Sequence, residues 1–258
     1  MSPLVFITGA SSGIGQALAL RYAQAGWRLA LVARRGDEMR AWAHGHQLGP
    51  ERCAIYAADV ADAASIAAAA QACIAAQGLP EVVIANAGIS LGVDTAHAED
   101  LAVMQQVYAT NVFGMAATFQ PFILPMRERR SGTLVGIASV AGVRGLPGHA
   151  AYCSSKAAVV SYCESLRGEC RGSGVRVVTV APGYVATPLT SKNRYAMPFL
   201  MQPEAFAERA FRAITSGASY RAIPWQMGWA AALLRLLPNA LFDRAFAGQP
   251  RKQRHIDK

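Results

Sequence analysis

The sequence predicts an α/β fold in which a doubly wound parallel sheet is covered by helices on both faces. Short, fully apolar segments alternate with helical patterns, which is typical of parallel strands that are buried on both faces. A glycine-rich turn follows the first apolar segment and opens a helical pattern. No Ser/Gly-rich linker or shift in composition divides the 258 residues, so we expect a single domain over residues 1–258.

Six apolar segments are expected to form strands: Leu4–Ile7, Leu29–Ala33, Ala54–Ala57, Val82–Ala85, Thr133–Ile137 and Arg176–Ala181. A helical pattern runs from Gln16 to about Ala25, and Gly26 ends it. The alanine-rich segment 63–76 is composed of helix-favouring residues, so we interpret it as a helix. With 53% hydrophobic and 16% charged residues, the chain can bury a large core.

The turn after the first strand has the composition of a phosphate-binding loop. It consists of Thr8, Gly9, Ala10, Ser11, Ser12, Gly13, Ile14 and Gly15, in the spacing G-x-x-x-G-x-G. This spacing is neither G-x-G-x-x-G nor a P-loop. Backbone N–H groups at a helix N-terminus attract a pyrophosphate, and glycines let it approach closely. We therefore predict a Rossmann-type nucleotide site; the alternative is a tight strand-to-helix connection without a ligand.

Three polar residues near the middle of the chain suggest acid–base chemistry. Tyr152 precedes Lys156 by four residues, which places both on one face of a helix, and Ser139 lies thirteen residues before the tyrosine. A free phenol, with a pKa near ~10, is a poor base at neutral pH. A nearby ammonium group is expected to lower that pKa. The serine hydroxyl can donate a hydrogen bond to a substrate oxygen.

Together these motifs resemble the short-chain dehydrogenase/reductase family over roughly residues 3–190. The glycine-rich turn matches the family's T-G-x-x-x-G-x-G motif, and the tyrosine and lysine match its Y-x-x-x-K motif. One departure is Ala85, where many members have a second asparagine before N-A-G. The other matching residues are Asp59-Val60, Asn86-Ala87-Gly88, Asn111, Ser139, Pro182-Gly183 and Thr187.

The resemblance implies an oxidoreductase that interconverts a carbonyl group and an alcohol with a nicotinamide cofactor. It implies that Tyr152 transfers the proton, that Lys156 also holds the nicotinamide ribose, and that Asn111 supports a proton relay through water. Thr187 would hold the carboxamide of the nicotinamide, and Asp59 with Val60 would meet the adenine. The full set implied for cofactor binding is Gly9, Ser11, Ser12, Gly13, Ile14, Gly15, Arg34, Asp59, Val60, Asn86, Ala87, Gly88, Tyr152, Lys156, Pro182, Gly183, Val185 and Thr187.

The end of the second predicted strand indicates a preference for NADP(H). An acid is usual there in NAD-binding sheets, because it binds the ribose hydroxyls of the adenosine. This strand instead ends in Arg34 and Arg35. A guanidinium can pair with the 2′-phosphate in a bidentate manner. We predict Arg34 as the main contact and Arg35 as a helper; otherwise both point to solvent.

The C-terminal third is less clearly related to the family. By resemblance, residues of about 188–203 form a mobile substrate lid, and Tyr195, Met197, Phe199, Leu200 and Met201 make it apolar. An apolar lid favours a hydrophobic substrate, although the lid side chains would otherwise pack on their own protein. The extension of about 225–258 carries apolar residues through Leu237, for which we expect core packing, with a subunit contact or a membrane surface as alternatives. Residues 251–255 are expected to fray.

By resemblance we also expect a homodimer. Helices near Leu101–Phe119 and Tyr152–Gly168 would pair across a two-fold axis. Their apolar residues include Val107, Val112, Met115, Ala157, Val160 and Leu166. A tetramer is less certain, because the chain lacks the glycine-rich terminal strand of many tetrameric relatives.

Composition restricts other partners. The net charge of +9 is expected to attract anionic cofactors or to form a solvated basic surface. No basic stripe or aromatic-basic module indicates nucleic-acid binding. Five cysteines without metal-ligand spacing indicate reduced thiols, no metal site and a cytoplasmic location. We find neither a signal-peptide pattern nor a membrane span in the sequence.

Two other functional classes remain alternatives. One is a non-catalytic nucleotide-binding sensor on the same fold, which predicts loss of at least one of Asn111, Ser139, Tyr152 and Lys156. The other is a peripheral membrane protein that docks on lipid through residues 225–247. The specific substrate and the physiological direction of the reaction do not follow from the sequence.

Overall fold

A computed structural model describes residues 2–191, 193, 195–248 and 251–254 of the chain. Its seven strands form one sheet in the order β3-β2-β1-β4-β5-β6-β7, and all neighbouring strands are parallel. The strands are β1 (Leu4–Thr8), β2 (Arg28–Ala33), β3 (Cys53–Ala57), β4 (Val82–Ala85), β5 (Gly132–Ile137), β6 (Val175–Pro182) and β7 (Tyr220–Ile223).

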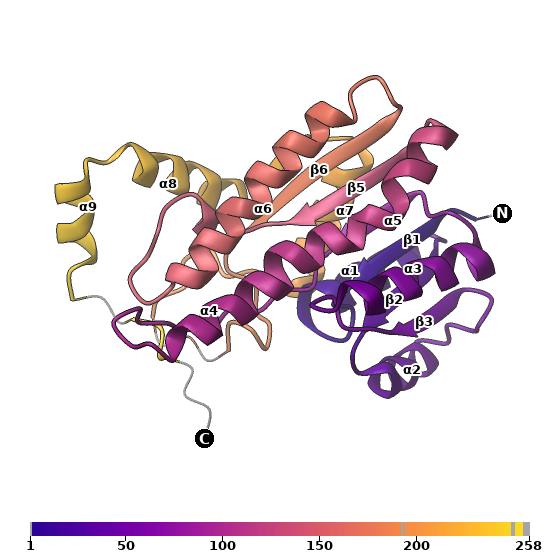
Figure 1. Ribbon diagram of the computed structural model, residues 1–258, viewed down its shortest axis with the longest axis horizontal. Helices are drawn as coiled ribbons and strands as arrows, with labels where there is room; N and C mark the ends of the chain where they lie inside the picture. Colours follow the sequence, from indigo (N-terminus) through magenta and orange to yellow (C-terminus); the bar gives the residue numbers. More distant parts are fainter. Residues whose placement is uncertain (1, 192, 194, 249–250, 255–258) are drawn as a thin grey trace.

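Helices cover both faces of this sheet (Figure 1). They are α1 (Gly13–Gln24), α2 (Gly36–Gly45), α3 (Ala63–Gln77), α4 (Asp100–Tyr108), the π-helical segment η1 (Ala109–Phe113), α5 (Gly114–Arg129), the 3₁₀ turn η2 (Val140–Gly142), α6 (Ala150–Glu169), α7 (Pro203–Thr215), α8 (Trp225–Leu236) and α9 (Asn239–Phe246). The predicted Rossmann-type, doubly wound parallel sheet is therefore confirmed.

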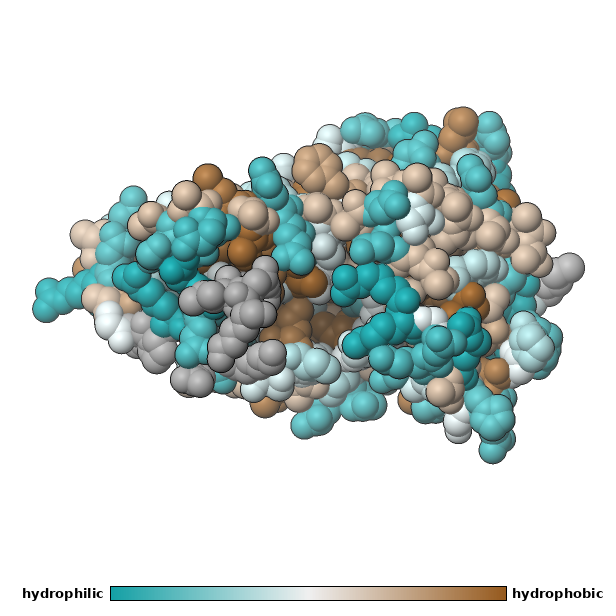
Figure 2. All heavy atoms as spheres, turned by 60° about the horizontal axis from the view of Figure 1, so that its bottom comes forward, coloured by the Kyte–Doolittle hydropathy of each residue, from teal (hydrophilic) through white to brown (hydrophobic). Residues whose placement is uncertain are grey.

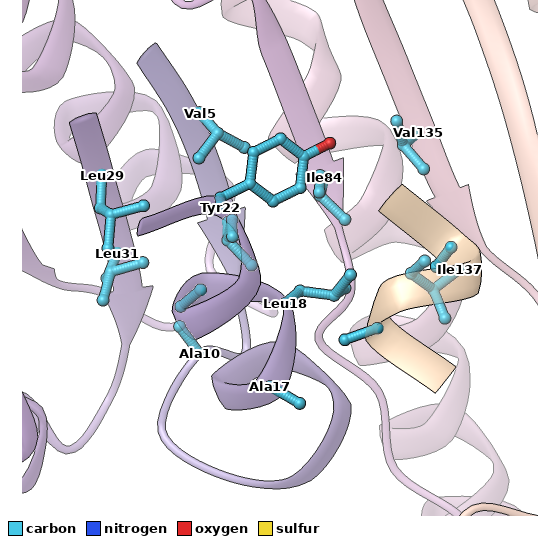
Figure 3. Close-up of a cluster of buried hydrophobic side chains, with 14 of the residues drawn as sticks. Val5, Ala10, Ala17, Leu18, Tyr22, Leu29, Leu31, Ile84, Val135 and Ile137 are labelled. Carbon is cyan, nitrogen blue, oxygen red and sulfur yellow. The ribbon is translucent and has the colours of Figure 1, made fainter. Parts of the chain in front are cut away.

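Alternation of side chains along the strands divides the core into two layers. Val5 of β1 lies beside Leu18 and Tyr22 of α1 (Figure 3), and the same cluster includes Ile7 of β1 and side chains of α2 and α7. Leu4 and Phe6, which point to the opposite face, pack with residues of α3, α5 and α6. Because the central strands are buried on both faces, their sequences are largely continuous hydrophobic runs.

The six predicted strands are present, each within one residue of its expected ends. The seventh, β7, was not predicted, because Tyr220-Arg221-Ala222-Ile223 is an edge strand in which only Ile223 is fully buried. Helix α1 begins at Gly13, three residues before the predicted start. The helix therefore starts inside the glycine-rich turn, and this brings its N-terminus to the edge of the sheet.

The predicted core packing of the C-terminal extension is wrong for most of its large side chains. In α8 only Ala231 is fully buried, and in α9 only Phe242. Residues 251–254, expected to fray, are instead held by side-chain contacts: Arg254 pairs with Glu99 and Asp100, and Lys252 Nζ lies 2.7 Å from Ser90 Oγ. His255, also part of that expectation, lies outside the described residues. None of the described helices combines the length and the hydrophobicity needed to cross a bilayer.

Candidate active site

The carboxyl ends of the strands form a cleft of about 430 Å³ beside the point where β1 and β4 run side by side. This is where the strand order reverses, and ligands of doubly wound sheets bind at such a point. Figure 2 brings the bottom of Figure 1 forward and shows a hollow near the middle of this side of the molecule. Apolar side chains lie at the floor of the hollow, and hydrophilic side chains surround it.

The glycine-rich loop forms one wall of this cleft. Ser11, Ser12, Gly13 and Ile14 line it, and the N-cap Ser12 is extended, with no side-chain cap bond among the described residues. The first turn of α1 has no acidic residue. The N-terminus of α1 thus presents N–H groups without a neighbouring carboxylate, which suits an anionic ligand.

Thr8 and Asn86 join the ends of β1 and β4 under the loop. Asn86 Nδ2 donates to Thr8 O at 3.0 Å and to Gly9 O at 3.2 Å, while Asn86 N donates to Thr8 Oγ1 at 3.1 Å. These bonds satisfy polar groups that would otherwise be left unpaired at the strand ends. They hold the loop and the Asn86-Ala87-Gly88 segment in one fixed arrangement.

Gly15 does not line the cleft, although it belongs to the motif. A Cβ atom at this position would lie 2.2 Å from Gly9 O and 2.6 Å from Asn86 Nδ2. The residue therefore permits the close approach of α1 to the strand ends, and it supports the loop from behind.

We expect Gly15→Ala to destabilise the protein strongly. Overpacking of this kind costs about 1–3 kcal/mol, which corresponds to a fall in Tm of roughly 2–10 °C for a chain of this size. Gly168→Ala is the matched control, because that glycine is exposed in α6 and a Cβ atom there meets no heavy atom within 4 Å. Differential scanning calorimetry of both variants tests this; equal Tm values would contradict the role given to Gly15.

Ser139, Tyr152 and Lys156 come together at the other end of the cleft and all three line it. Ser139 follows β5, and the other two lie on the first turns of α6. Lys156 is buried, its Nζ donates to Ile137 O at 2.8 Å, and it lies 5.9 Å from the centre of the Tyr152 ring. No carboxylate of the described residues pairs with this lysine.

The pKa values at this end differ from the sequence-based expectation. Tyr152 is half-buried and lines the cleft, and desolvation of its phenol raises the pKa to about 12. The Ser139 hydroxyl opposes the increase. Burial also lowers the pKa of Lys156 to about 8. Burial therefore shifts the pKa of Tyr152 in the direction opposite to the one expected from the ammonium group.

Asn111 lies behind the cleft and does not line it. Its Oδ1 accepts from Ile89 N at 2.8 Å, and its Nδ2 donates to Ile89 O at 2.9 Å and to Ser155 Oγ at 3.0 Å. The residue is buried in the π-helical turn η1. It ties the segment after β4 to α6, and so fixes the loop that carries Gly88 relative to Lys156.

The two arginines at the end of β2 both line the cleft. Arg34 is exposed, and its Nη1 lies 3.8 Å from Asp59 Oδ2. Arg35 Nη2 donates to Ser11 Oγ at 3.1 Å, and its Nε lies 3.1 Å from Glu38 Oε2. Arg35 thus contacts the glycine-rich loop directly, while Arg34 has more freedom to meet a ligand.

The remaining predicted site residues also border the cleft: Gly9, Asp59, Val60, Asn86, Ala87, Gly88, Pro182, Gly183, Val185 and Thr187. Further lining residues were not predicted, among them Ala58, Ile89, Gln106 and Thr110, and the first residues of the predicted lid, Pro188, Leu189 and Thr190, also line the cleft. Most of these adjoin a predicted motif in sequence, so proximity to the motif was the available signal. Among the described residues, no group of three or more His, Cys, Asp and Glu side chains is arranged to hold a metal ion.

The side chains of the predicted lid that line the cleft are not the apolar ones expected from the sequence. Of Met197, Phe199, Leu200 and Met201, none lines the cleft, and Phe199 and Leu200 are exposed. Tyr195 packs instead against His149 and Tyr184, and its hydroxyl lies 3.2 Å from His149 Nε2. Burial lowers the pKa of His149. Residues 192 and 194 of the lid, and 249–250 and 255–258 of the extension, lie outside the described residues.

Comparison with known proteins agrees with this arrangement. The sequence model of the family described as short chain dehydrogenase matches residues 3–197. An uncharacterized oxidoreductase of Myxococcus xanthus (strain DK1622) is 38% identical over 239 residues, which cover 93% of this chain and 94% of that protein.

Solved structures share the fold. The structure of 3-ketoacyl-(acyl-carrier-protein) reductase from Brucella melitensis complexed with NADH has a TM-score of 0.78 at 25% identity, covering 86% of this chain and 96% of that chain. The closed form of serine dehydrogenase complexed with NADP+ has a TM-score of 0.76 at 24% identity, covering 85% and 94%. The similar structures thus hold either NADP+ or NADH.

Proposed function

The chain belongs to the short-chain dehydrogenase family of oxidoreductases, and from this premise we propose that it interconverts a carbonyl group and an alcohol with NADP(H). The observation that carries the proposal is the meeting of Ser139, Tyr152 and Lys156 in the cleft that the glycine-rich loop borders. A hydroxyl donor, a phenol and a buried cation form an acid–base site within reach of a nucleotide site.

The residues of the cleft fit a dinucleotide. The N-terminus of α1 would hold the pyrophosphate, Asp59 and Val60 the adenine, and Arg34 with Arg35 a 2′-phosphate. Lys156 would hold the nicotinamide ribose. Gly88 leaves room beside the ammonium group, because a Cβ atom added to Gly88 would lie 3.3 Å from Lys156 Nζ. Pro182, Gly183, Val185 and Thr187 would border the nicotinamide. When bound, the cofactor supplies or accepts the hydride.

The chain's own residues orient the substrate and move the proton. Ser139 and Tyr152 donate hydrogen bonds to the carbonyl oxygen, and Tyr152 then delivers its proton. With a pKa of about 12, the phenol is protonated at neutral pH and is ready to act as an acid. A preference for NADP(H) would favour carbonyl reduction as the working direction. Asn111 acts by fixing the Ile89 backbone and α6 rather than by touching substrate.

A screen of ketones and aldehydes with NADPH tests the proposal, followed by the loss of absorbance of the reduced cofactor. We expect NADPH consumption with at least one carbonyl compound. If the protein bound NADPH but consumed none across the panel, the non-catalytic sensor would become the better explanation.

We propose that the substrate carries an apolar tail. Ile89, Val185 and Leu189 line the cleft, whereas the lid residues first expected to do so do not. We propose that residues of about 188–203 form a lid over this pocket. The whole chain is proposed to be one domain, with a C-terminal extension of about 225–258. Tyr195 is the side chain by which this lid contacts the segment before α6.

We expect kcat/KM to rise along a series of aldehydes of increasing chain length. Burial of each methylene contributes about 0.8 kcal/mol, or roughly fourfold, until the pocket is full. Leu189→Ala should flatten this slope. Phe199→Ala is the matched control and should leave it unchanged, because Phe199 is exposed and does not line the cleft. A flat series in the wild type would argue against an apolar pocket.

The protein is proposed to be a homodimer through α4, η1, the start of α5 and α6. Val107, Met115 and Leu166, named from the sequence, are buried within their own chain. Leu101 and Phe113 are exposed on the same segment and are therefore the candidates for the contact. Closed two-fold dimers are the commonest oligomers.

Sedimentation equilibrium at micromolar concentration is expected to give a dimer mass, and Phe113→Glu should shift it to the monomer because a carboxylate would be desolvated in the contact. A monomer mass for the wild type would refute this proposal. If Phe113→Glu left the dimer mass unchanged, the subunit contact would have to lie on another surface.

A further inference from the structure

Helix α8 presents an uninterrupted apolar stripe to the outside. Trp225, Trp229, Leu233 and Leu236 follow helical spacing, and their exposed fractions are 62%, 67%, 64% and 80%. Leu241 of α9 is exposed as well. Figure 1 shows α8 and α9 together at one end of the molecule, beyond the layers that cover the sheet. Contiguous exposed apolar surface of this kind marks an interaction site.

The stripe faces outward because other contacts hold α8 at its C-terminal end and at Met227. Arg144 Nη1 donates to Leu234 O and, at 2.7 Å, to Leu237 O, and its guanidinium carbon lies 3.9 Å from the centre of the Phe242 ring. Met227 packs closely against Gly183: a Cβ atom added to this glycine would lie 2.8 Å from Met227 Cγ. Rotation of α8 to bury the stripe would break these contacts.

A basic hollow adjoins the stripe at Trp225. It has a volume of about 370 Å³, and its lining includes Arg209, Arg212 and Arg221 but no acidic residue. Arg212 pairs with Glu208 at 2.6 Å. Within the described chain, Arg209 and Arg221 have no carboxylate within 4.0 Å. The hollow therefore concentrates positive charge next to an exposed indole ring.

We propose that the stripe and the basic hollow dock on the surface of a bilayer that contains anionic phospholipid. Tryptophan is enriched where apolar and polar layers of a membrane meet, and leucines can enter the acyl boundary. Arginine binds phosphate through its fork of donors, so Arg209 and Arg221 suit lipid headgroups. Charge complementarity thus selects an anionic membrane as the occupant.

A second copy of the chain fits this surface less well. An isologous contact would place the basic hollows around the same two-fold axis. Like charges brought together across an interface cost free energy unless acids lie between them. Across α8 and α9, both of which are fully described, Asp243 is the only acidic residue.

Docking would bring the cleft close to the bilayer. Helix α8 packs near the turn η2, which follows Ser139, and Met227 contacts Gly183 at the cleft wall. A carbonyl compound dissolved in the membrane would then have a short path to the site. This consequence rests on the proposed function, whereas docking itself does not.

Sedimentation of the full chain with vesicles tests the docking without any assay of activity. We expect binding to vesicles of phosphatidylcholine mixed with phosphatidylglycerol, weakened by added salt, and little binding to phosphatidylcholine alone. Trp229→Ser combined with Leu236→Ser should reduce binding by roughly tenfold or more. Arg209→Gln combined with Arg221→Gln should reduce it similarly and remove the salt dependence.

Two controls complete the experiment. Leu124→Ser removes a leucine of α5 that is as exposed as Leu233, and Arg171→Gln removes an exposed arginine far from α8 in the sequence; both should bind like the wild type. Absence of binding to anionic vesicles, or equal loss in the controls, would overturn the proposal. So would a lower oligomer mass for the Trp229/Leu236 variant without lipid, because the stripe would then be a subunit contact. Circular dichroism melting confirms that each variant is folded.

Discussion

Tyr152→Phe is expected to reduce kcat by about 10²- to 10⁴-fold on any substrate that the wild type turns over, because general acid–base catalysis contributes that much. The substitution keeps the ring and removes only the hydroxyl that carries the proton. The ring lies 5.9 Å from Lys156 Nζ, and that ammonium group keeps its hydrogen bond to Ile137 O without the phenol. Cofactor affinity should therefore be unchanged.

Two measurements check this result. Steady-state kinetics give kcat for the variant, and titration of NADPH fluorescence gives the Kd of the cofactor. Tyr220→Phe is the control, since it makes the same chemical change at an exposed residue of β7. If Tyr152→Phe retained more than about a tenth of wild-type kcat, the proton donor would have to be another group.

Arg34→Ala is expected to weaken NADPH binding by roughly 10- to 150-fold, because a charge-assisted bond to phosphate contributes about 1.5–3 kcal/mol. NADH, which lacks the 2′-phosphate, should be affected little. Arg34 is exposed and lies near Asp59, so its loss leaves no buried group unpaired. Arg35→Ala should have a smaller effect on NADPH, in keeping with the helper role.

Fluorescence titration of both cofactors with each variant measures the effect. Arg40→Ala is the matched control, because Arg40 is an exposed arginine of α2 that pairs with Asp37 at 2.7 Å and does not line the cleft. If Arg34→Ala weakened the binding of NADPH and NADH equally, Arg34 would not be the residue that determines a preference for NADP(H). A larger effect of Arg35→Ala would reverse the order of the two arginines.

Much of the fold and of the cleft was accessible from the sequence because the relevant signals are local. An apolar run such as Val82–Ala85 is buried on both faces wherever the sheet places it, so its identity as a strand depends little on its partners. The glycine-rich turn is equally local, since its conformation depends on its own backbone. The edge strand β7 lacked this signal, because its exposed residues do not form an apolar run.

The side chains around the motifs depended on contacts that spacing does not encode. Asn111 was recognised as a motif residue, but its three bonds to Ile89 and Ser155 come from chain segments 22 and 44 residues away. The direction of the pKa shift of Tyr152 likewise follows from the burial of the phenol, which only packing decides. In the lid, Tyr195 rather than Phe199 turns inward.

The sequence by itself therefore determined the parallel sheet and the glycine-rich loop, because periodicity and short-range backbone geometry specify them. It identified Ser139, Tyr152 and Lys156 as candidate site residues through their match to the motifs of the family. Only the tertiary structure decided which apolar side chains of the C-terminal extension are covered. Trp229 and Leu236 are as hydrophobic as core residues, yet Arg144 and Met227 hold α8 with these two facing outward. Burial is a property of the surfaces that meet, and hydropathy alone does not specify which surfaces those are.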